Sequence, residues 1–296
     1  GLTVDARGEL WVLAVLDPPP PPPPPIPAHA PGEGAGQGAG QGAEAAPAAS
    51  PPTRRAPLLR VLHAPGPGAL QEVARVPVAA DGALRTGAPA VGPDGTVYVP
   101  LYEQRREGAR GLGLGVVPAT RDRLDLWPGR LGYDGEGLDG QPVLPDAWVN
   151  AVAVAADGTV WVATNAGLAR QRGQQTTVFD ENAFIDSEVI LALTVDRAGR
   201  PWAGTFEGLG RLAGDAWTAV RPQGLGGPVH SIHLDSVGTL RVGTQHGLWV
   251  LESERTGWRR IDVDGRPDPG PVRGVWAGPG GDLWLATSQG LLRKAP

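Results

Sequence analysis

Short apolar runs that alternate with small or polar residues recur along the chain, and each is followed by a glycine-containing turn and a second apolar run. Residues 151–162 show the pattern: Val152 and Val154 alternate with alanines, Asp157 and Gly158 follow, and the next four residues are mostly apolar. Alternation with a period of two is typical of a half-buried β-strand, and a turn glycine supplies the positive φ that a tight hairpin needs. The pattern therefore predicts antiparallel β-hairpins.

The hairpin is part of a longer repeat. Four segments align without gaps, and they lie at residues 151–170, 191–211, 231–250 and 274–293. The glycines of their first turns occupy the same position and are Gly158, Gly199, Gly238 and Gly281. A second turn of sequence Thr-x-x-Gly-Leu then leads into a predicted third strand. A repeat of about forty residues is the length of one four-stranded blade, so we predict an all-β fold, a β-propeller of four-stranded blades.

Two weaker copies precede these four, at residues 2–11 and 91–99, and both lose the Thr-x-x-Gly-Leu turn. We therefore predict a single propeller domain over residues 1–296 with six blades in this segment. The predicted blades cover residues 1–79, 80–147, 148–180, 188–221, 229–263 and 271–296. Because Gly1 already falls in an innermost strand and the sixth unit stops after its third strand, we expect a segment truncated at both ends and a parent ring of seven blades.

Tryptophan is the dominant aromatic residue, with ten Trp against three Tyr and three Phe. Four of the tryptophans fall in the second strand of a predicted blade, and they are Trp11, Trp161, Trp202 and Trp284. A large flat side chain at a repeated position buries much apolar area, so we interpret these residues as wedges packed between neighbouring blades. In the fifth unit Arg241 takes this place.

Residues 17–57 interrupt the pattern with eight consecutive prolines followed by Gly, Ala, Gln and Pro. Such a composition cannot bury enough apolar surface to offset the entropy of ordering, so we predict a stiff polyproline arm followed by flexible, disordered coil. The stretch falls where the turn between the second and third strands of the first blade belongs. We interpret it as an insertion tolerated in a surface loop, with a docking arm for a proline-binding partner as the alternative.

Charge, cysteine content and hydropathy argue against several classes of function. A net charge of −5 and the lack of a basic cluster disfavour nucleic acid as a partner. Without cysteine there are no disulfides and no thiolate nucleophiles or ligands. No run of eighteen apolar residues predicts a membrane span in this segment, although the parent chain could tether it. The glycine run at residues 111–115 follows no strand-to-helix pattern, so we interpret it as a glycine-rich loop rather than a phosphate-binding loop.

The repeat resembles a known family. The phrase D-x-x-G-x-[LVP]-W-[VLA]-[AG]-T-x-x-G-L occurs in residues 196–209 and, from its glycine onward, in residues 157–168. It is similar to the two-component regulator propeller repeat, strongly over residues 148–293 and weakly over residues 1–102. The resemblance implies a ligand-sensing domain in the periplasm or elsewhere outside the inner membrane. In that family such domains serve hybrid histidine kinases and related regulators.

Candidate ligand-binding residues come from the connections between the last strand of one blade and the first strand of the next, which propeller geometry brings to one face. The residues on which we place the ligand site are Asp180, Glu181, Asp186, His230, Asp262 and Asp264. Further acids in these connections are Asp134, Glu136, Asp139, Glu188 and Asp268. None has the full spacing of a calcium loop, so we predict no metal site. Solvated turn residues are the alternative interpretation, since Asp is common in turns.

Histidines are the other candidates for chemistry. His230 and His233 belong to the predicted innermost strand of the fifth blade. Side chains alternate along a regular strand, so these two have opposite parity and do not share a face, which argues against a common metal. No Ser-His-Asp set can be assembled either, and we predict no catalytic residue.

The sequence therefore predicts a ligand-sensing or protein-binding propeller rather than an enzyme, with no cofactor. The ligand stays open between a small molecule, a saccharide and a protein. Two alternatives remain. One is a propeller lyase acting on a cyclic peptide or polysaccharide, with His230 and neighbouring carboxylates as acid and base. The other is a free-standing protein-interaction scaffold.

Overall fold

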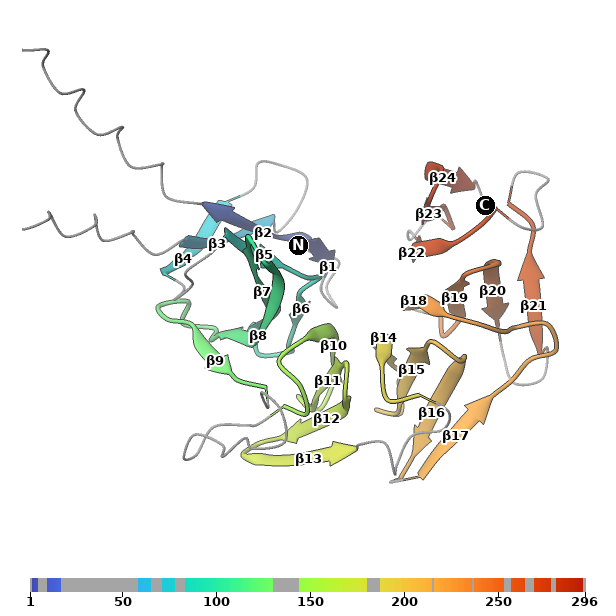
Figure 1. The fold of residues 1–296 in the computed structure, drawn as a ribbon, viewed down its shortest axis with the longest axis horizontal. Helices are drawn as coiled ribbons and strands as arrows, with labels where there is room; N and C mark the ends of the chain where they lie inside the picture. Colours follow the sequence, from blue (N-terminus) through green and yellow to red (C-terminus); the bar gives the residue numbers. More distant parts are fainter. Residues whose placement is uncertain are drawn as a thin grey trace, which may run out of the picture.

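Six antiparallel β-sheets make up the part of the chain that the structure, a computed structural model, describes (Figure 1). The described residues are 2–4, 10–16, 58–64, 71–77, 83–129, 144–179, 187–214, 216–235, 237–252, 257–263, 269–277 and 281–294. The sheets follow one another in sequence order around a common centre, as blades do. The prediction of an all-β propeller with six blades is confirmed.

Four sheets contain four strands paired in sequence order. The first comprises β1 (Leu2–Val4), β2 (Leu10–Leu16), β3 (Leu58–Ala64) and β4 (Gln71–Pro77). The third comprises β10 (Val149–Val154), β11 (Val160–Thr164), β12 (Gly167–Arg172) and β13 (Gln175–Phe179). The fourth comprises β14 (Ile190–Val195), β15 (Pro201–Thr205), β16 (Leu209–Ala213) and β17 (Ala216–Val220). The fifth comprises β18 (Val229–Leu234), β19 (Leu240–Thr244), β20 (Gly247–Leu251) and β21 (Trp258–Ile261).

The second and sixth sheets differ from this plan. The sixth has three strands among the described residues, β22 (Val272–Ala277), β23 (Leu283–Thr287) and β24 (Gly290–Lys294). The second comprises β5 (Ala83–Thr86), β6 (Ala90–Val91), β7 (Val97–Arg105), β8 (Gly108–Val117) and β9 (Asp125–Trp127). Both β5 and β6 pair with β7, and between them the Gly87 N–H donates to the Pro100 carbonyl at 2.9 Å. The second sheet is therefore a four-stranded blade whose first strand is interrupted.

The first strands of the sheets lie around the centre of the propeller. Strand β10 contacts β14, β14 contacts β18 and β18 contacts β22, and β6 contacts both β1 and β10. The last strands, such as β13, β17 and β21, lie on the outer rim (Figure 1). The connection from a last strand to the next first strand therefore opens on the same face as the turn between second and third strands.

The turn glycines of the first hairpins have backbone conformations that only glycine adopts easily. The φ angles of Gly158, Gly199, Gly238 and Gly281 are 82°, 77°, 93° and 86°. The Gly199 N–H donates to the Asp196 carbonyl at 2.9 Å and so closes a β-turn. An L side chain at such a φ is strained, which explains why the repeat keeps glycine here.

The threonine of the Thr-x-x-Gly-Leu turn closes the second hairpin. The Thr164 hydroxyl donates to the Gly167 carbonyl at 2.9 Å and accepts from the Ala166 N–H at 3.2 Å. The same two bonds form at Thr205, Thr244 and Thr287. Thr164, Thr205 and Thr244 are buried. The repeated threonine is thus explained by turn geometry, without any ligand.

Apolar clusters fill the interfaces between consecutive sheets. Trp161 of the third sheet is 3% exposed and belongs to a cluster with Leu193 and Leu212 of the fourth. Trp202 of the fourth sheet clusters with Leu240 of the fifth in the same way. Trp11 joins the first sheet to the second, and its cluster includes neighbours from both. Each of the first five sheets buries one face on the sheet that follows it.

An arginine covers three of the repeat tryptophans. The pairs lie directly opposite each other on the second and third strands, and they are Trp161 with Arg170, Trp202 with Arg211, and Trp284 with Arg293. The guanidinium carbons lie 5.7, 5.3 and 5.5 Å from the ring centroids. Such cation–π contacts add stability to the packed indole.

Close approach of one sheet to the next requires a small residue in the second strand. A Cβ at Gly204 would lie 2.4 Å from Val229 Cγ1 of the next innermost strand, and one at Gly243 would lie 2.5 Å from the Val272 carbonyl oxygen. Side chains at these two positions would push neighbouring sheets apart.

The interpretation of residues 111–115 as a glycine-rich loop is wrong, because they belong to strand β8. Glycine inside a strand marks a bulge or a close backbone approach. Both occur here. The β7–β8 register shifts between Leu101 and Tyr102, and a Cβ at Gly111 would lie 2.3 Å from the Ala147 carbonyl oxygen. At Gly113 a Cβ would meet the Trp127 carbonyl oxygen at 2.3 Å.

The predicted arm at residues 17–57 lies outside the described residues. Its two neighbours, Leu16 and Leu58, pair directly across β2 and β3. The stretch therefore connects the second and third strands of the first sheet.

Replacing Trp161 by alanine is expected to lower the free energy of unfolding by about 3–5 kcal/mol, because it removes a large side chain from a packed interface between sheets. Urea unfolding measures this loss. Trp276→Ala is the matched control, since Trp276 is 41% exposed. An equal loss in both variants would contradict the packing role of Trp161.

Thr164→Val is expected to cost about 1 kcal/mol of unfolding free energy, because valine keeps the shape of threonine but loses both turn hydrogen bonds. Thr287→Val is the control, since Thr287 makes the same bonds in a more exposed turn. We expect a smaller loss there, measured by the shift in the urea midpoint.

Candidate functional site

A bulge distorts the start of four innermost strands. In β18 the pairing with β19 shifts between Val229 and Ser231, and β10, β14 and β22 show the same shift at the equivalent place. The bulged residues are Asn150, Leu191, His230 and Arg273. These residues begin innermost strands, so they lie at the centre of the face on which the ligand site was predicted. Bulges redirect side chains and are common beside functional sites.

His230 makes a polar contact on this face. Its Nε2 lies 3.1 Å from Oε1 of Gln245, which belongs to the turn between β19 and β20. Since an amide oxygen only accepts, the imidazole donates in this bond. The equivalent pair in the third sheet is Asn150 and Asn165, with 2.8 Å between Nδ2 and Oδ1. These pairs tie the innermost strand to the turn beside it.

The parity argument for His230 and His233 is wrong in its premise, because the bulge makes the strand irregular at His230. The two imidazoles nevertheless contact different elements. His230 contacts Gln245, whereas His233 Nε2 accepts from the Ala277 N–H of β22 at 3.4 Å. In the described part of the chain, no group of three or more His, Asp and Glu residues could hold a metal ion.

Of the other predicted ligand residues, Asp262 alone lies in the described part of the chain, and it lies far from His230. Asp262 directly follows β21 and is exposed. His230 lies on β18, so the width of a four-stranded sheet, about 14 Å, separates their backbones. The remaining candidates, Asp180, Glu181, Asp186 and Asp264, lie outside the described residues, as do Asp134, Glu136, Asp139 and Asp268.

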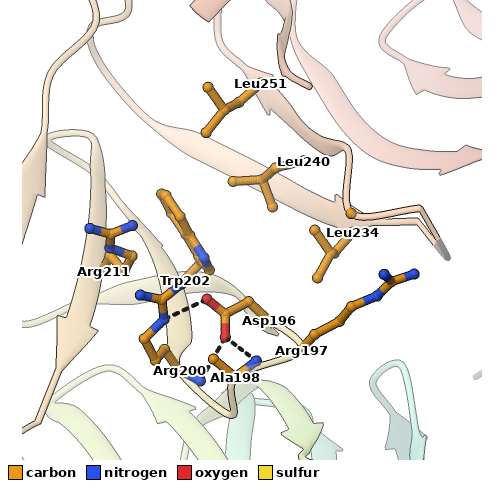
Figure 2. A pocket seen from close by; sticks show the side chains of 10 residues that line it. Asp196, Arg197, Ala198, Arg200, Trp202, Arg211, Leu234, Leu240 and Leu251 are labelled. Carbon is orange, nitrogen blue, oxygen red and sulfur yellow. Dashed lines mark hydrogen bonds and ion pairs between the residues drawn. The ribbon is translucent and has the colours of Figure 1, made fainter. Parts of the chain in front are cut away.

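A cavity of about 360 Å³ lies between the fourth and fifth sheets (Figure 2). The fourth sheet contributes one wall, formed by Asp196, Arg197, Ala198, Arg200, Trp202 and Arg211. The fifth sheet contributes the other, formed by Leu234, Gly238, Leu240 and Leu251. The cavity adjoins the turns that follow β14 and β18, so it opens on the face opposite the predicted ligand site.

Most polar groups of the cavity come from the turn after β14. Asp196 Oδ1 accepts from the N–H groups of Ala198 and Arg200, both at 2.9 Å, and Oδ2 accepts from Arg200 Nε at 2.8 Å (Figure 2). Arg197 is exposed and has no ion-pair partner among the described residues. The Arg211 guanidinium lies over Trp202. Sequence reasoning missed this site because its walls belong to two different repeats.

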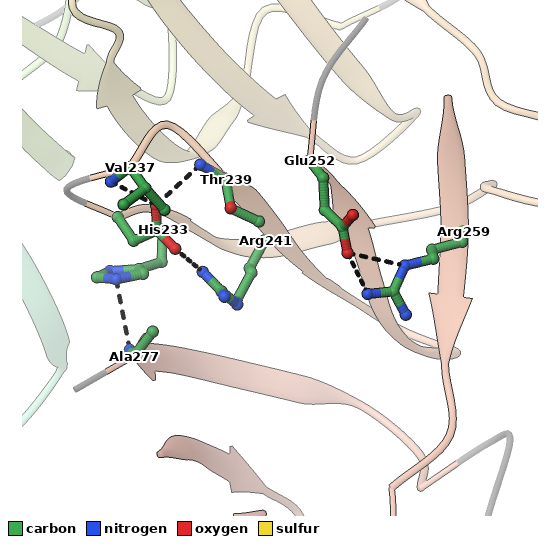
Figure 3. A network of polar contacts seen from close by, with 8 residues as sticks. His233, Val237, Thr239, Arg241, Glu252, Arg259 and Ala277 are labelled. Carbon is green, nitrogen blue, oxygen red and sulfur yellow. Dashed lines mark hydrogen bonds and ion pairs between the residues drawn. The ribbon is translucent and has the colours of Figure 1, made fainter. Parts of the chain in front are cut away.

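A second polar cluster lies between the fifth and sixth sheets (Figure 3). Asp235 Oδ2 accepts from Arg241 at 2.7 Å, and its Oδ1 accepts from the N–H groups of Val237 and Thr239. Burial would raise the pKa of Asp235, but these hydrogen bonds outweigh it and lower the pKa. Arg241, which stands at the tryptophan position, therefore caps the turn of its own sheet by an ion pair.

His233 lies beside this ion pair. Burial lowers the pKa of His233, the Arg241 charge lowers it further, and the Asp235 charge opposes the shift. A neutral imidazole can accept at Nε2 from the Ala277 N–H, whereas a protonated one has no acceptor there. This one hydrogen bond between innermost strands β18 and β22 thus requires the neutral form.

Comparison with known proteins identifies the fold. No protein-family model matches the sequence, and none of the curated proteins matches it. Among solved structures, the extracellular domain of BT4673 from B. thetaiotaomicron, described as a one-component system, is 16% identical, with 81% of this chain and 31% of that chain covered and a TM-score of 0.53. The extracellular domain of BT3049 from the same organism, described as a hybrid two-component system, is 14% identical, with coverages of 80% and 32% and a TM-score of 0.56.

A third solved structure is PorZ, a bacterial surface component of the type-IX secretion system of Porphyromonas gingivalis. It is 16% identical, with 82% of this chain and 37% of that chain covered and a TM-score of 0.53. The chain thus spans about a third of the length of these proteins. At such identities the likeness shows the fold, and the fold agrees with the resemblance to two-component regulator propellers. Within the described residues, no helix has the length and apolar character needed to cross a bilayer.

The lowered pKa of His233 predicts a pH effect on stability. Below about pH 6.5 the unfolded chain takes up a proton at this residue before the folded chain does, so acidification favours unfolding. We expect the wild type to lose more unfolding free energy than His233→Gln between about pH 7.5 and about pH 5. Urea unfolding at both pH values measures the difference, and equal losses would show that His233 does not contribute.

Proposed function

We propose that the chain is the ligand-binding propeller of an extracytoplasmic sensor of the two-component regulator type. The observation that carries the proposal is the repeat itself, in which the turn glycine and the Thr-x-x-Gly-Leu turn recur in the third to sixth sheets, with a tryptophan at one shared position of the third, fourth and sixth. Extracellular domains described as parts of one- and two-component systems share this fold. Each repeated residue has a structural task, which leaves ligand recognition to positions that vary between sheets.

Lyase chemistry is the weaker alternative. It needs a carboxylate beside His230 to act with the imidazole in proton transfer. Among the described residues, the side chain that contacts His230 is the Gln245 amide, which cannot act as an acid or a base near neutral pH. A binding role for this residue fits the contact better, because imidazole and amide together offer a donor and acceptors to a ligand.

The proposal predicts the content of the parent reading frame. We expect it to encode further propeller repeats, a membrane span, and a histidine kinase or another regulatory module. Sequencing the frame in both directions from this segment tests the expectation. A parent reading frame that encodes neither a membrane-spanning segment nor a regulatory module would refute the sensor proposal and favour a free-standing propeller.

A further prediction concerns location. Alkaline phosphatase fused after residue 296 in the parent protein is expected to be active, because that enzyme folds only where disulfides form, outside the cytoplasm. The matched control is the same fusion with β-galactosidase. An active β-galactosidase fusion together with an inactive phosphatase fusion would contradict an extracytoplasmic position.

A further inference from the structure

The cavity between the fourth and fifth sheets combines positive charge with an apolar wall. Its lining contains three arginines and one aspartate, in a protein whose net charge is −5. Asp196 is already bonded to Arg200, and Arg197 has no ion-pair partner among the described residues, so the charge of Arg197 is not balanced. A cavity with excess positive charge on an acidic protein favours an anionic ligand.

The arginines in the turn are not a requirement of the fold. The turn positions of Arg197 and Arg200 are occupied by Ala156 and Thr159 in the third unit, and by Ser236 and Thr239 in the fifth. The hairpins of the third and fifth sheets close with the same backbone hydrogen bonds without these cations. The two arginines are therefore specific to the unit that borders the cavity.

Arg197 is the arginine best placed to meet a ligand. It is exposed, lines the cavity, and extends away from the Asp196–Arg200 pair (Figure 2). A guanidinium group binds a carboxylate through two parallel N–H···O bonds, which an ammonium group cannot match in geometry. An anion bound here would leave the turn hydrogen bonds of Asp196 intact.

The opposite wall is apolar. Leu234, Leu240 and Leu251 come from three strands of the fifth sheet, and Trp202 lies across the cavity from them (Figure 2). The volume falls in the lower part of the range typical of small-molecule sites, about 300–1,000 Å³. A flat apolar body lying along this wall would cover the half-buried Leu234 and Leu251 while its charged end faces Arg197.

We propose that this cavity binds a small organic anion with a flat apolar body, of which an aromatic carboxylate is the simplest case. The inference rests on the proposed sensor function, since it names the chemical class of the ligand. It also assigns recognition to the interface of two sheets, on the face opposite His230. Binding there bridges the two sheets and so couples occupancy to their relative position.

The test compares a matched pair of probes on the full 296-residue chain. Naphthalene-2-carboxylate and naphthalene-2-carboxamide share one shape and differ in charge, and inorganic phosphate supplies an anion without an apolar body. Isothermal titration calorimetry measures each. We expect the carboxylate to bind about tenfold tighter than the amide, as one charge-assisted hydrogen bond predicts, and tighter than phosphate. Equal binding of acid and amide, tighter binding of phosphate, or no binding of the acid at millimolar concentration would overturn the proposal.

Three variants locate the binding. Arg197→Gln is expected to weaken the carboxylate about tenfold and to leave the amide unchanged. Arg106→Gln is the control, because Arg106 is another exposed turn arginine and its loss changes the net charge equally. Ala198→Trp is expected to block both probes by filling the cavity. The turn tolerates a larger residue at this place, since the fifth sheet carries Val237 there at 78% exposure.

The outcomes separate this inference from the proposed function. If Arg197→Gln and Ala198→Trp bind the carboxylate as the wild type does, the cavity proposal is wrong whatever the reading frame encodes. If the variants behave as expected but the frame lacks a regulatory module, the cavity binds the anion and the sensor proposal is wrong. Thermal unfolding of each variant shows whether a loss of binding reflects a loss of fold.

Discussion

Burial of one sheet face against the next sheet is the interaction on which the rest of the structure depends. A single antiparallel sheet of four short strands has no core of its own, so each becomes stable through its neighbour. Trp161 and Trp202 show how this works, because each packs on leucines of the following sheet. Small residues such as Gly204 bring the sheets close enough for this packing. The cavity between the fourth and fifth sheets lies where this packing brings two sheets together.

Local rules explain which parts of the fold the sequence predicts. Gly158 and Gly199 lie in turns whose φ requires glycine, so hairpins and repeat length could be read directly from the chain. The glycines at Gly111 and Gly113 have another cause, since they admit backbone from Ala147 and Trp127. That contact involves segments distant in sequence. Judged from its sequence neighbours alone, a run of glycines indicates a loop, which is why the strand was not predicted. The interruption between β5 and β6 was not predicted either, because it is defined by how both strands pair with β7.

The candidate site was harder to predict than the fold. Acidic residues in connections between sheets are expected on conformational grounds alone, so their presence does not identify a ligand. The bulge at His230 changes the direction of its side chain, and no local sequence pattern predicts that bulge. The cavity needs Arg197 from one repeat and Leu240 from the next, so it appears only once two sheets are packed. Its one sequence signal was the departure of the turn at Arg197 and Arg200 from the other repeats.

The direct pairing of Leu16 with Leu58 has a consequence for how this protein can change. The chain leaves β2 and enters β3 at points about 5 Å apart, the spacing of neighbouring strands. The entropy of closing a loop grows only logarithmically with its length, so the hairpin is nearly indifferent to how many residues connect its ends. A folded domain whose own termini lie close together could therefore be inserted between Leu16 and Leu58 without moving either strand.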